Sequence, residues 1–268
     1  AISSKYAVKR RTPLSSESGT ITIDEEHFKV VEECAVIYTR GGNLKRMNKK
    51  LLARGAEGGE ATDRNLPAQI IETNTEAKLW LFTNRANLYS LDVESIKEAK
   101  YKDAGSTINS LLAGIEKGEK IISVSSPMPG RLLTVSKSGM VKYTDFTELE
   151  SRKQKIIACG LKPKDELLLA EADNAALPNL LLVTKSGMSI CFSKEEISLQ
   201  GKTGKGVGGI KLAADDSIIF AAQTDGQGNL AIFSELGFAK QSKLSEYEVQ
   251  GRNGKGLKTF QWAKGSAN

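Results

Sequence analysis

The sequence predicts an all-β fold, a propeller-like array of about five four-stranded blades. The first observation behind this prediction is a hairpin-like unit that recurs along the chain and is clearest in residues 179–192 (NLLLVTKSGMSICF). The second is the spacing of the copies, because their turn positions lie 44, 53, 48 and 50 residues apart. A period of about 40–50 residues with several strands per unit is typical of propeller-like arrays. A β-sandwich whose hairpins resemble one another by chance is the alternative.

Each copy of the unit is predicted to form two strands around a short polar turn. β-branched and aromatic residues flank the turn, and a glycine supplies the positive φ that tight hairpins require. Ala86 is the exception, because it stands where the other copies have glycine. A Thr or Ser precedes each of these positions by three residues. The copies span residues 35–47, 79–91, 131–143, 179–192 and 229–241, with turn positions Gly42, Ala86, Gly139, Gly187 and Gly237 and hydroxyl residues Thr39, Thr83, Ser136, Thr184 and Ser234.

Further segments extend the unit on both sides of the hairpin. An apolar strand is expected before each of the last four hairpins, at residues 69–72, 120–124, 166–170 and 217–221. A short polar segment suited to one helical turn is expected after these hairpins, at residues 92–96, 145–149, 194–197 and 243–247. A basic, glycine-bearing stretch follows, most clearly at residues 199–212 (LQGKTGKGVGGIKL) and 249–260 (VQGRNGKGLKTF).

The chain is predicted to have two parts. Residues 1–27 are polar, serine-rich and basic, so we expect a linker or arm that follows a preceding region. Residues 28–268 hold the predicted blades, beginning with a strand at residues 28–31. Because the chain begins at Ala1 without a methionine or a signal peptide, we expect it to be an excised fragment. No apolar run reaches the length of about 18 residues that a membrane span needs, so no membrane partner is expected.

The titratable residues point away from catalysis. Cys34, Cys159 and Cys191 include no C-x-x-C pair, and His27 is the only histidine. A zinc site or a disulfide framework is therefore not expected, and a reducing cytoplasm fits this cysteine usage. A serine nucleophile needs an adjacent base, and Ser138 and Ser186, which stand beside turn glycines, have no histidine to activate them. We expect no catalytic residue, no metal and no cofactor in this chain, and we expect it to bind a partner instead.

The net charge of +6 is modest for 268 residues, so the placement of the basic residues is more informative than the net charge. Most of them are lysines, which are mobile point charges suited to contacting phosphates rather than to reading base edges. The glycine-rich loops at residues 201–211 and 251–258 carry the strongest signal, since backbone N–H groups in such turns can form small anion-binding nests beside lysines. Neither loop is a Walker A motif, because Gly204-Lys205 is followed by Gly206.

These features resemble a known family. The five hairpins, the segment KYKDAG at residues 100–105 and the loops QGKTGKGVGGIKL and QGRNGKGLKTF are similar to the C-terminal domain of bacterial type IIA DNA topoisomerase A subunits, namely gyrase A and its topoisomerase IV counterpart. The similarity starts near Arg10, where Arg10-Arg11-Thr12 resembles the Arg-Arg-Thr that precedes this domain in the family. The resemblance implies a β-pinwheel, a propeller-like disc whose blades exchange strands and whose basic rim bends duplex DNA.

One departure from the family pattern concerns the gyrase box, of the form Q-(R/K)-R-G-G-(R/K)-G after the first hairpin. Residues 53–59 (ARGAEGG) occupy that place, and Glu57 stands where the family has a cation. This difference favours a topoisomerase IV-type protein over gyrase A and argues against active negative supercoiling. Family members cleave DNA through a tyrosine in a separate N-terminal domain. This chain alone is therefore expected neither to cleave DNA nor to use ATP.

The resemblance also implies partners. These are double-stranded DNA, the ATPase B subunit of a heterotetramer whose other parts use ATP and Mg²⁺, and the N-terminal breakage-reunion domain of the parent polypeptide. The isolated domain is expected to be a monomer in the bacterial cytoplasm, near the nucleoid. Two rival interpretations are a propeller that docks acidic protein partners and a small-molecule site at the centre of the blade array.

Smooth bending of a short duplex costs on the order of 1–6 kcal/mol, which a curved row of phosphate contacts can offset. The candidate DNA-binding residues are Lys45, Arg46, Lys49, Lys142, Arg152, Lys153, Lys155, Lys202, Lys205, Lys211, Lys240, Arg252, Lys255 and Lys258.

Overall fold

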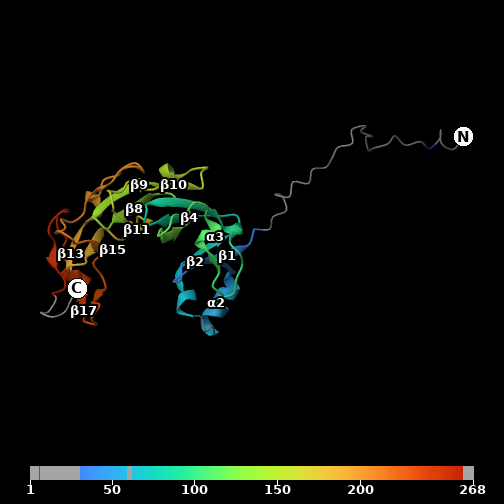
Figure 1. Cartoon of the computed structure of the whole chain (residues 1–268), viewed down its shortest axis with the longest axis horizontal. Coiled ribbons are helices and arrows are strands. Elements are labelled where there is room, and N and C mark those ends of the chain that lie inside the picture. Colours follow the sequence, from blue (N-terminus) through green and yellow to red (C-terminus); the bar gives the residue numbers. More distant parts are fainter. Residues whose placement is uncertain (1–5, 7–30, 59–61, 262–268) are drawn as a thin grey trace. The chain divides into compact units, whose positions relative to one another are not determined.

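A computed structural model describes Tyr6 and residues 31–58 and 62–261 (Figure 1). The chain divides into two compact units, Ala1–Val31 and Glu32–Asn268. The predicted boundary between residues 27 and 28 lies outside the described residues, as does most of the strand predicted at residues 28–31. No helix among the described residues is long and apolar enough to cross a membrane.

Five antiparallel sheets make up the described part of this unit. Sheet A has the strand order β3-β1-β2-β6, sheet B β10-β5-β4-β7, sheet C β11-β8-β9-β14 and sheet D β15-β12-β13-β18, whereas sheet E contains only β16 and β17. The predicted all-β array of about five blades is confirmed, with the fifth blade reduced to its hairpin among the described residues.

The central hairpins match the repeated unit of the sequence. They are β1 (Glu33–Thr39) with β2 (Asn43–Asn48), β4 (Lys78–Thr83) with β5 (Asn87–Asp92), β8 (Arg131–Ser136) with β9 (Met140–Asp145), β12 (Asn179–Thr184) with β13 (Met188–Ser193), and β16 (Asn229–Phe233) with β17 (Ala239–Lys243). The outer strands are β3 (Pro67–Asn74), β6 (Ser106–Thr107), β7 (Ile121–Ser125), β10 (Lys155–Ile157), β11 (Leu167–Ala172), β14 (Val207–Gly208), β15 (Ile218–Thr224) and β18 (Leu257–Lys258).

The turns show why the hydroxyl residue and the glycine recur. In each hairpin the hydroxyl oxygen accepts the backbone N–H of the residue four positions later, as between Thr39 and Asn43 and between Ser234 and Phe238. The residue at the glycine position always has a positive φ. Ala86 adopts this conformation too, with φ 58° and no exposed surface, so the turn keeps its shape where the sequence broke the pattern.

The predicted flanking strands form, but each joins the sheet of the hairpin that precedes it. Thus β3 pairs with β1, β7 with β4, β11 with β8 and β15 with β12. The other edge of each four-stranded sheet is formed by strand exchange. In each case a strand that follows the next hairpin in sequence pairs with the second strand of the earlier hairpin. These exchanged pairs are β6 with β2, β10 with β5, β14 with β9 and β18 with β13. Neighbouring sheets are therefore linked by the backbone as well as by packing.

Short helices fill the connections. The predicted helical turns after the last four hairpins are confirmed as the 3₁₀ helices η3 (Val93–Ser95), η4 (Phe146–Leu149), η5 (Lys194–Glu196) and η6 (Leu244–Glu246). The first hairpin is followed instead by α2 (Lys49–Gly58) and η2 (Asp63–Asn65), and β6 is followed by α3 (Ile108–Leu111). The residues in the place of the gyrase box thus lie in α2 as far as Gly58.

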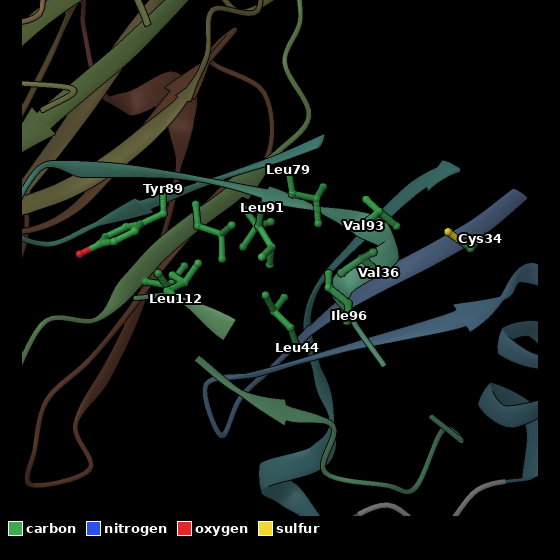
Figure 2. Close-up of a cluster of buried hydrophobic side chains, with 12 residues drawn as sticks. Cys34, Val36, Leu44, Leu79, Tyr89, Leu91, Val93, Ile96 and Leu112 are labelled. Atoms are coloured by element: carbon green, nitrogen blue, oxygen red, sulfur yellow. The ribbon is translucent and has the colours of Figure 1, made fainter. Parts of the chain in front are cut away.

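The hydrophobic core lies between successive sheets. Figure 2 shows one cluster, in which Val36 and Leu44 of sheet A pack with Leu79 and Tyr89 of sheet B, all of them buried. Comparable clusters join sheet B to sheet C, sheet C to sheet D, and sheet D to the hairpin of sheet E. Since full burial of one such side chain contributes about 1.5–3 kcal/mol, these clusters hold each blade against the next.

Candidate nucleic-acid interface

The basic loops of successive blades contact one another. The Gly160 N–H donates to the Gly204 carbonyl at 3.1 Å, and the Asn253 N–H donates to the Gly209 carbonyl at 2.8 Å. The Lys211 N–H also donates to the Gly254 carbonyl at 2.8 Å. These bonds join residues 152–160, which include β10, to the loops at residues 201–211 and 251–258, and we call these three segments together the loop row.

Most of the predicted DNA-binding residues of the loop row present their side chains to solvent. Lys205, Lys211, Lys255 and Lys258 are exposed, and no hydrogen bond or ion pair of these four side chains occurs within the described residues. Arg152 and Lys153, which precede β10, are exposed in the same way. Their ammonium and guanidinium groups are free to contact an anionic partner.

Lys202 and Arg252 occupy equivalent places and are anchored alike. The Lys202 N–H donates to the Glu148 carboxylate at 3.1 Å, and its Nζ donates to the Glu148 carbonyl at 3.4 Å. The Arg252 N–H donates to the Glu196 carboxylate at 2.9 Å, while its guanidinium donates to the Gly208 carbonyl at 2.5 Å. Both residues are half-buried, so each loop is fixed to the preceding 3₁₀ helix.

Two of the residues predicted to contact DNA are buried. Lys45 and Lys142 are 0% and 1% exposed. Lys45 Nζ donates to the carbonyls of Tyr101 and Asp103, and Lys142 Nζ donates to the Gly201 carbonyl at 2.8 Å. Burial lowers the pKa of both ammonium groups. These lysines hold the next unit's loop against the hairpin, and we expect them not to contact phosphates.

Replacement of Lys142 by Met tests this assignment. We expect an unchanged affinity for duplex DNA, because the ammonium group faces the Gly201 carbonyl rather than solvent. The stability is expected to change by less than about 2 kcal/mol, since removal of a buried charge offsets the unpaired carbonyl. Fluorescence anisotropy with labelled duplex measures the affinity. Lys205→Met is the comparison, and equal losses for the two variants would restore Lys142 to the DNA contacts.

The remaining predicted residues lie on strands β2, β10 and β17 and at the start of helix α2. Lys49 pairs with Glu33 at 2.9 Å and Glu72 at 3.1 Å, and Arg46 is half-buried in β2. Lys155 lies over the Tyr89 ring, 5.3 Å from its centroid. Lys240 is exposed, and its Nζ donates to the Thr259 carbonyl at 2.8 Å.

The loop glycines serve close packing more than anion binding. A Cβ at Gly206 would lie 2.5 Å from the Val141 carbonyl oxygen, and one at Gly209 would lie 2.7 Å from Leu182. The N–H groups of Gly204, Gly206 and Gly209 already donate to protein acceptors. The predicted backbone nests are therefore largely occupied by the protein itself, and the exposed lysines remain as the anion-binding groups.

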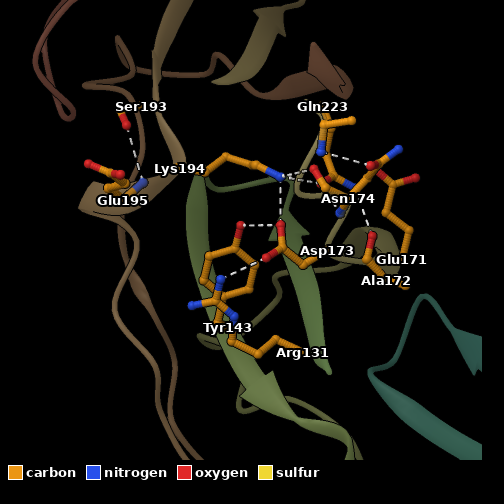
Figure 3. Close-up of polar contacts among 11 residues, drawn as sticks. Arg131, Tyr143, Glu171, Ala172, Asp173, Asn174, Ser193, Lys194, Glu195 and Gln223 are labelled. Carbon is orange, nitrogen blue, oxygen red and sulfur yellow. Dashed lines mark hydrogen bonds and ion pairs between the residues drawn. The ribbon is translucent and has the colours of Figure 1, made fainter. Parts of the chain in front are cut away.

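Sequence reasoning missed two features. Lys100 and Lys102 are exposed in the first loop, in register with the later basic loops, and the KYKDAG segment could have identified them. The second is a polar cluster between sheets C and D, which no sequence signal indicated (Figure 3). There Asp173 accepts hydrogen bonds from Lys194 Nζ at 2.5 Å, Tyr143 at 2.9 Å and Arg131 at 2.7 Å.

The cysteines and the turn hydroxyl of Ser186 are buried or hydrogen-bonded within the fold. Cys34, Cys159 and Cys191 are free and buried, and His27 lies outside the described residues. The hydroxyl of Ser186 donates to Asp216 at 2.5 Å, which fixes the turn of sheet D. No group of three or more His, Cys, Asp or Glu residues in the described part could hold a metal ion.

Comparison with known proteins gives a consistent result. A family model described as "DNA gyrase C-terminal domain, beta-propeller" matches residues 78–127, 130–171, 178–225 and 228–261. Each matched segment begins with one hairpin of sheets B to E, and the hairpin of sheet A lies outside them.

Relatives match almost the whole chain. The A subunit of DNA topoisomerase 4 from Bacillus subtilis (strain 168) is 29% identical over 266 residues, covering 96% of this chain and 32% of the relative. The A subunit of DNA gyrase from Helicobacter pylori (strain ATCC 700392 / 26695) is 31% identical over 272 residues, covering 96% of this chain and 32% of the relative. The chain thus spans about a third of the length of these relatives. A solved C-terminal domain of DNA topoisomerase IV is 26% identical with a TM-score of 0.77, covering 85% of this chain and 72% of that one.

Proposed function

This chain belongs to the family of the DNA gyrase C-terminal domain, a beta-propeller, and from that premise we propose that it binds duplex DNA through the loop row without regard to base sequence. The proposed contacts are the exposed cations Lys205, Lys211, Lys255 and Lys258, with Arg152 and Lys153 on the neighbouring loop. Lysine-rich loops suit phosphate contacts, which carry most non-specific affinity for DNA.

One observation carries this proposal: backbone hydrogen bonds join the basic loops of consecutive blades. Gly209 accepts the N–H of Asn253, and Gly254 accepts the N–H of Lys211. These bonds hold together the two loops that carry Lys205 and Lys255. A fixed series of cations along a row lets several phosphates be neutralised at once, which offsets the cost of bending the duplex. Arg252 strengthens the row, since its guanidinium is tied to Gly208 of the neighbouring loop.

The double change Lys205→Glu with Lys255→Glu tests the proposal. Each substitution removes one phosphate contact and adds a repulsive charge, so we expect the affinity for a duplex of about 40 base pairs to fall by at least about tenfold, or 1.4 kcal/mol. The slope of log affinity against log salt should become shallower by about 1.8, since each phosphate contact contributes about 0.9. Fluorescence anisotropy at several salt concentrations gives both quantities.

The matched control is Lys162→Glu with Lys185→Glu, which makes the same change of charge at exposed lysines outside the loop row. Its affinity for duplex is expected to stay within about threefold of the parent protein, because only long-range electrostatics change. Equal losses for the two double variants would contradict a defined track. An affinity of the parent protein that does not respond to salt would instead favour an acidic protein partner.

We further propose that the parent protein is of the topoisomerase IV type rather than gyrase A. The residues in the place of the gyrase box include Glu57 and lie in the helix α2 as far as Gly58, which supports a weak contact with DNA at this point. The relatives carry both names, so a direct test is needed. Ligation of nicked circles in the presence of the domain should introduce little net writhe, whereas strong wrapping would favour gyrase A.

In the parent enzyme this domain would act beside a breakage-reunion domain and an ATPase partner, which would supply the cleaving tyrosine, ATP and Mg²⁺. On this proposal the isolated domain is a cytoplasmic, nucleoid-associated monomer that binds DNA but does not relax or cleave it.

A further inference from the structure

The interface between sheets A and B differs from the other interfaces of the repeat. Helix η2, after the first hairpin, and helix α3, after β6, have no counterpart between sheets B and C or between sheets C and D in the described part of the chain. Both helices border a cavity of about 630 Å³ at the turn of the first hairpin. Departures from a regular repeat are expected where a site has been built, because local regularity is otherwise favoured.

The cavity depends on the fit of η2 against the turn. Gly41 donates its N–H to the Arg64 carbonyl at 2.7 Å, and a Cβ at this position would lie 2.9 Å from the same oxygen. The corresponding residues of the other hairpins, Arg85, Ser138, Ser186 and Leu236, all carry a side chain. Gly41 thus allows the approach that brings Arg64 to the cavity.

The charge of the cavity wall is positive. Arg40, Arg64 and Lys120 line it, and within the described residues only Arg40 has an ion pair, with Asp63 at 3.5 Å. Glu166 occupies the position equivalent to Lys120 in the following unit. The Lys120 carbonyl accepts the N–H of Asn84, and the Glu166 carbonyl accepts the N–H of Lys137, which has the same place in the next turn. The positive wall is therefore specific to this interface.

The one carboxylate among the described residues of the wall is already satisfied. Glu119 accepts hydrogen bonds from Thr83 at 2.6 Å and Asn87 at 2.7 Å, and also from the Glu116 N–H. Burial by itself would raise the pKa of Glu119, but these hydrogen bonds outweigh burial and hold the pKa below its ordinary value. The charges that line the cavity still sum to an excess of cations.

The rest of the cavity wall is suited to a planar heterocyclic ring. Tyr38, Ile108, Ile115 and Ile121 give the cavity an apolar side, and the tyrosine hydroxyl donates to the Ile121 carbonyl at 3.2 Å. The side-chain amides of Asn43 and Asn109 also line the cavity and have no partner within the described residues. Amides offer both a donor and an acceptor, which is what the polar edge of a heterocycle requires.

We propose that this cavity binds a nucleoside phosphate, with the phosphate at Arg64 and Lys120 and the base against Tyr38 and the isoleucines. Its volume lies within the range of about 300–1,000 Å³ typical of small-molecule sites and exceeds what an inorganic phosphate alone would fill. The site is separate from the loop row and does not depend on the DNA-binding proposal.

Titration calorimetry with adenosine monophosphate tests the proposal, with inorganic phosphate and adenosine as probes of the two halves. We expect adenosine monophosphate to bind more tightly than either part. Arg64→Ala with Lys120→Ala should weaken this binding at least about tenfold, because two charged hydrogen-bond donors to the phosphate are lost. Lys162→Ala with Lys185→Ala, which carries the same charge change outside the cavity, should leave it unchanged.

Asn109→Trp is a second variant that fills the cavity without removing a cation. It should abolish binding of adenosine monophosphate while leaving the affinity for duplex DNA as it was. Failure of adenosine monophosphate to bind the parent protein would overturn the proposal, as would equal weakening by the two double variants. A loss of duplex affinity in the Arg64 and Lys120 variant without nucleotide binding would also overturn it and assign these cations to DNA.

Discussion

Asp173→Ala is expected to lower the free energy of unfolding by about 3–5 kcal/mol, the range measured when one partner of a buried ion pair is removed. The Lys194 side chain is 7% exposed, and its Nζ would keep only the Asn174 carbonyl at 2.8 Å and Gln223 at 2.7 Å. Because Tyr143 and Arg131 belong to sheet C and Lys194 directly follows β13 of sheet D, the change loosens an interface between blades. Urea denaturation measures the loss.

The pH dependence provides a second measurement of the same prediction. Burial by itself would raise the pKa of Asp173, but hydrogen bonds from Lys194, Tyr143 and Arg131 hold the pKa below its ordinary value. A lowered pKa in the folded state contributes stability above the unfolded value of about 3.9, and this contribution is lost as the pH falls through the folded pKa. The difference between the parent protein and Asp173→Ala should therefore be full above about pH 5 and shrink below about pH 4.

Two controls separate this cluster from ordinary surface charge. Asp92→Ala removes the partner of Lys78 in an exposed pair at 3.6 Å, and we expect a loss below about 1 kcal/mol. Adding Lys194→Met to Asp173→Ala should recover part of the stability, because it removes the charge left without a partner. If Asp173→Ala and Asp92→Ala cost the same, the cluster has no special role in joining the blades.

Gly206→Ala is expected to cost about 2–3 kcal/mol. Gly206 has φ 82°, where an L-residue is strained by about 1–2 kcal/mol, and its Cβ would lie 2.5 Å from the Val141 carbonyl oxygen. To relieve this contact the exchanged strand β14 must move away from β9, which weakens the link between sheets. Urea denaturation compares the variant with the parent protein.

The control for this prediction is Gly251→Ala in the equivalent loop of the next unit. A Cβ at Gly251 would meet no atom within 4 Å, so its cost should stay within about 0.5 kcal/mol. Loop glycines that bind anions through their backbone would show the opposite behaviour, with loss of DNA affinity and no loss of stability. That result for Gly206→Ala would contradict the packing role.

Local chemistry explains what could be predicted. The hairpins, their turns and the 3₁₀ helices depend on neighbouring residues, such as a Thr39 hydroxyl that accepts the Asn43 N–H at 3.1 Å. The sheet that each flanking strand joins could not be predicted, because it depends on contacts that are distant in sequence. Thus β7 pairs with β4, where Leu81 lies opposite Val124, and not with the hairpin that follows it. Asp173 was missed for the same reason, since its partners lie 21–42 residues away.

By itself the sequence determined the blade, the number of its copies and the family, since these rest on a pattern that repeats along the chain. Only the tertiary structure decided which cations reach solvent. Lys45, Lys142 and Lys240 each stand three residues after the turn glycine, yet the first two are buried and the third is exposed. Exchanged strands flank β2 and β9 but not β17 among the described residues, and the burial of a lysine depends on that neighbouring strand.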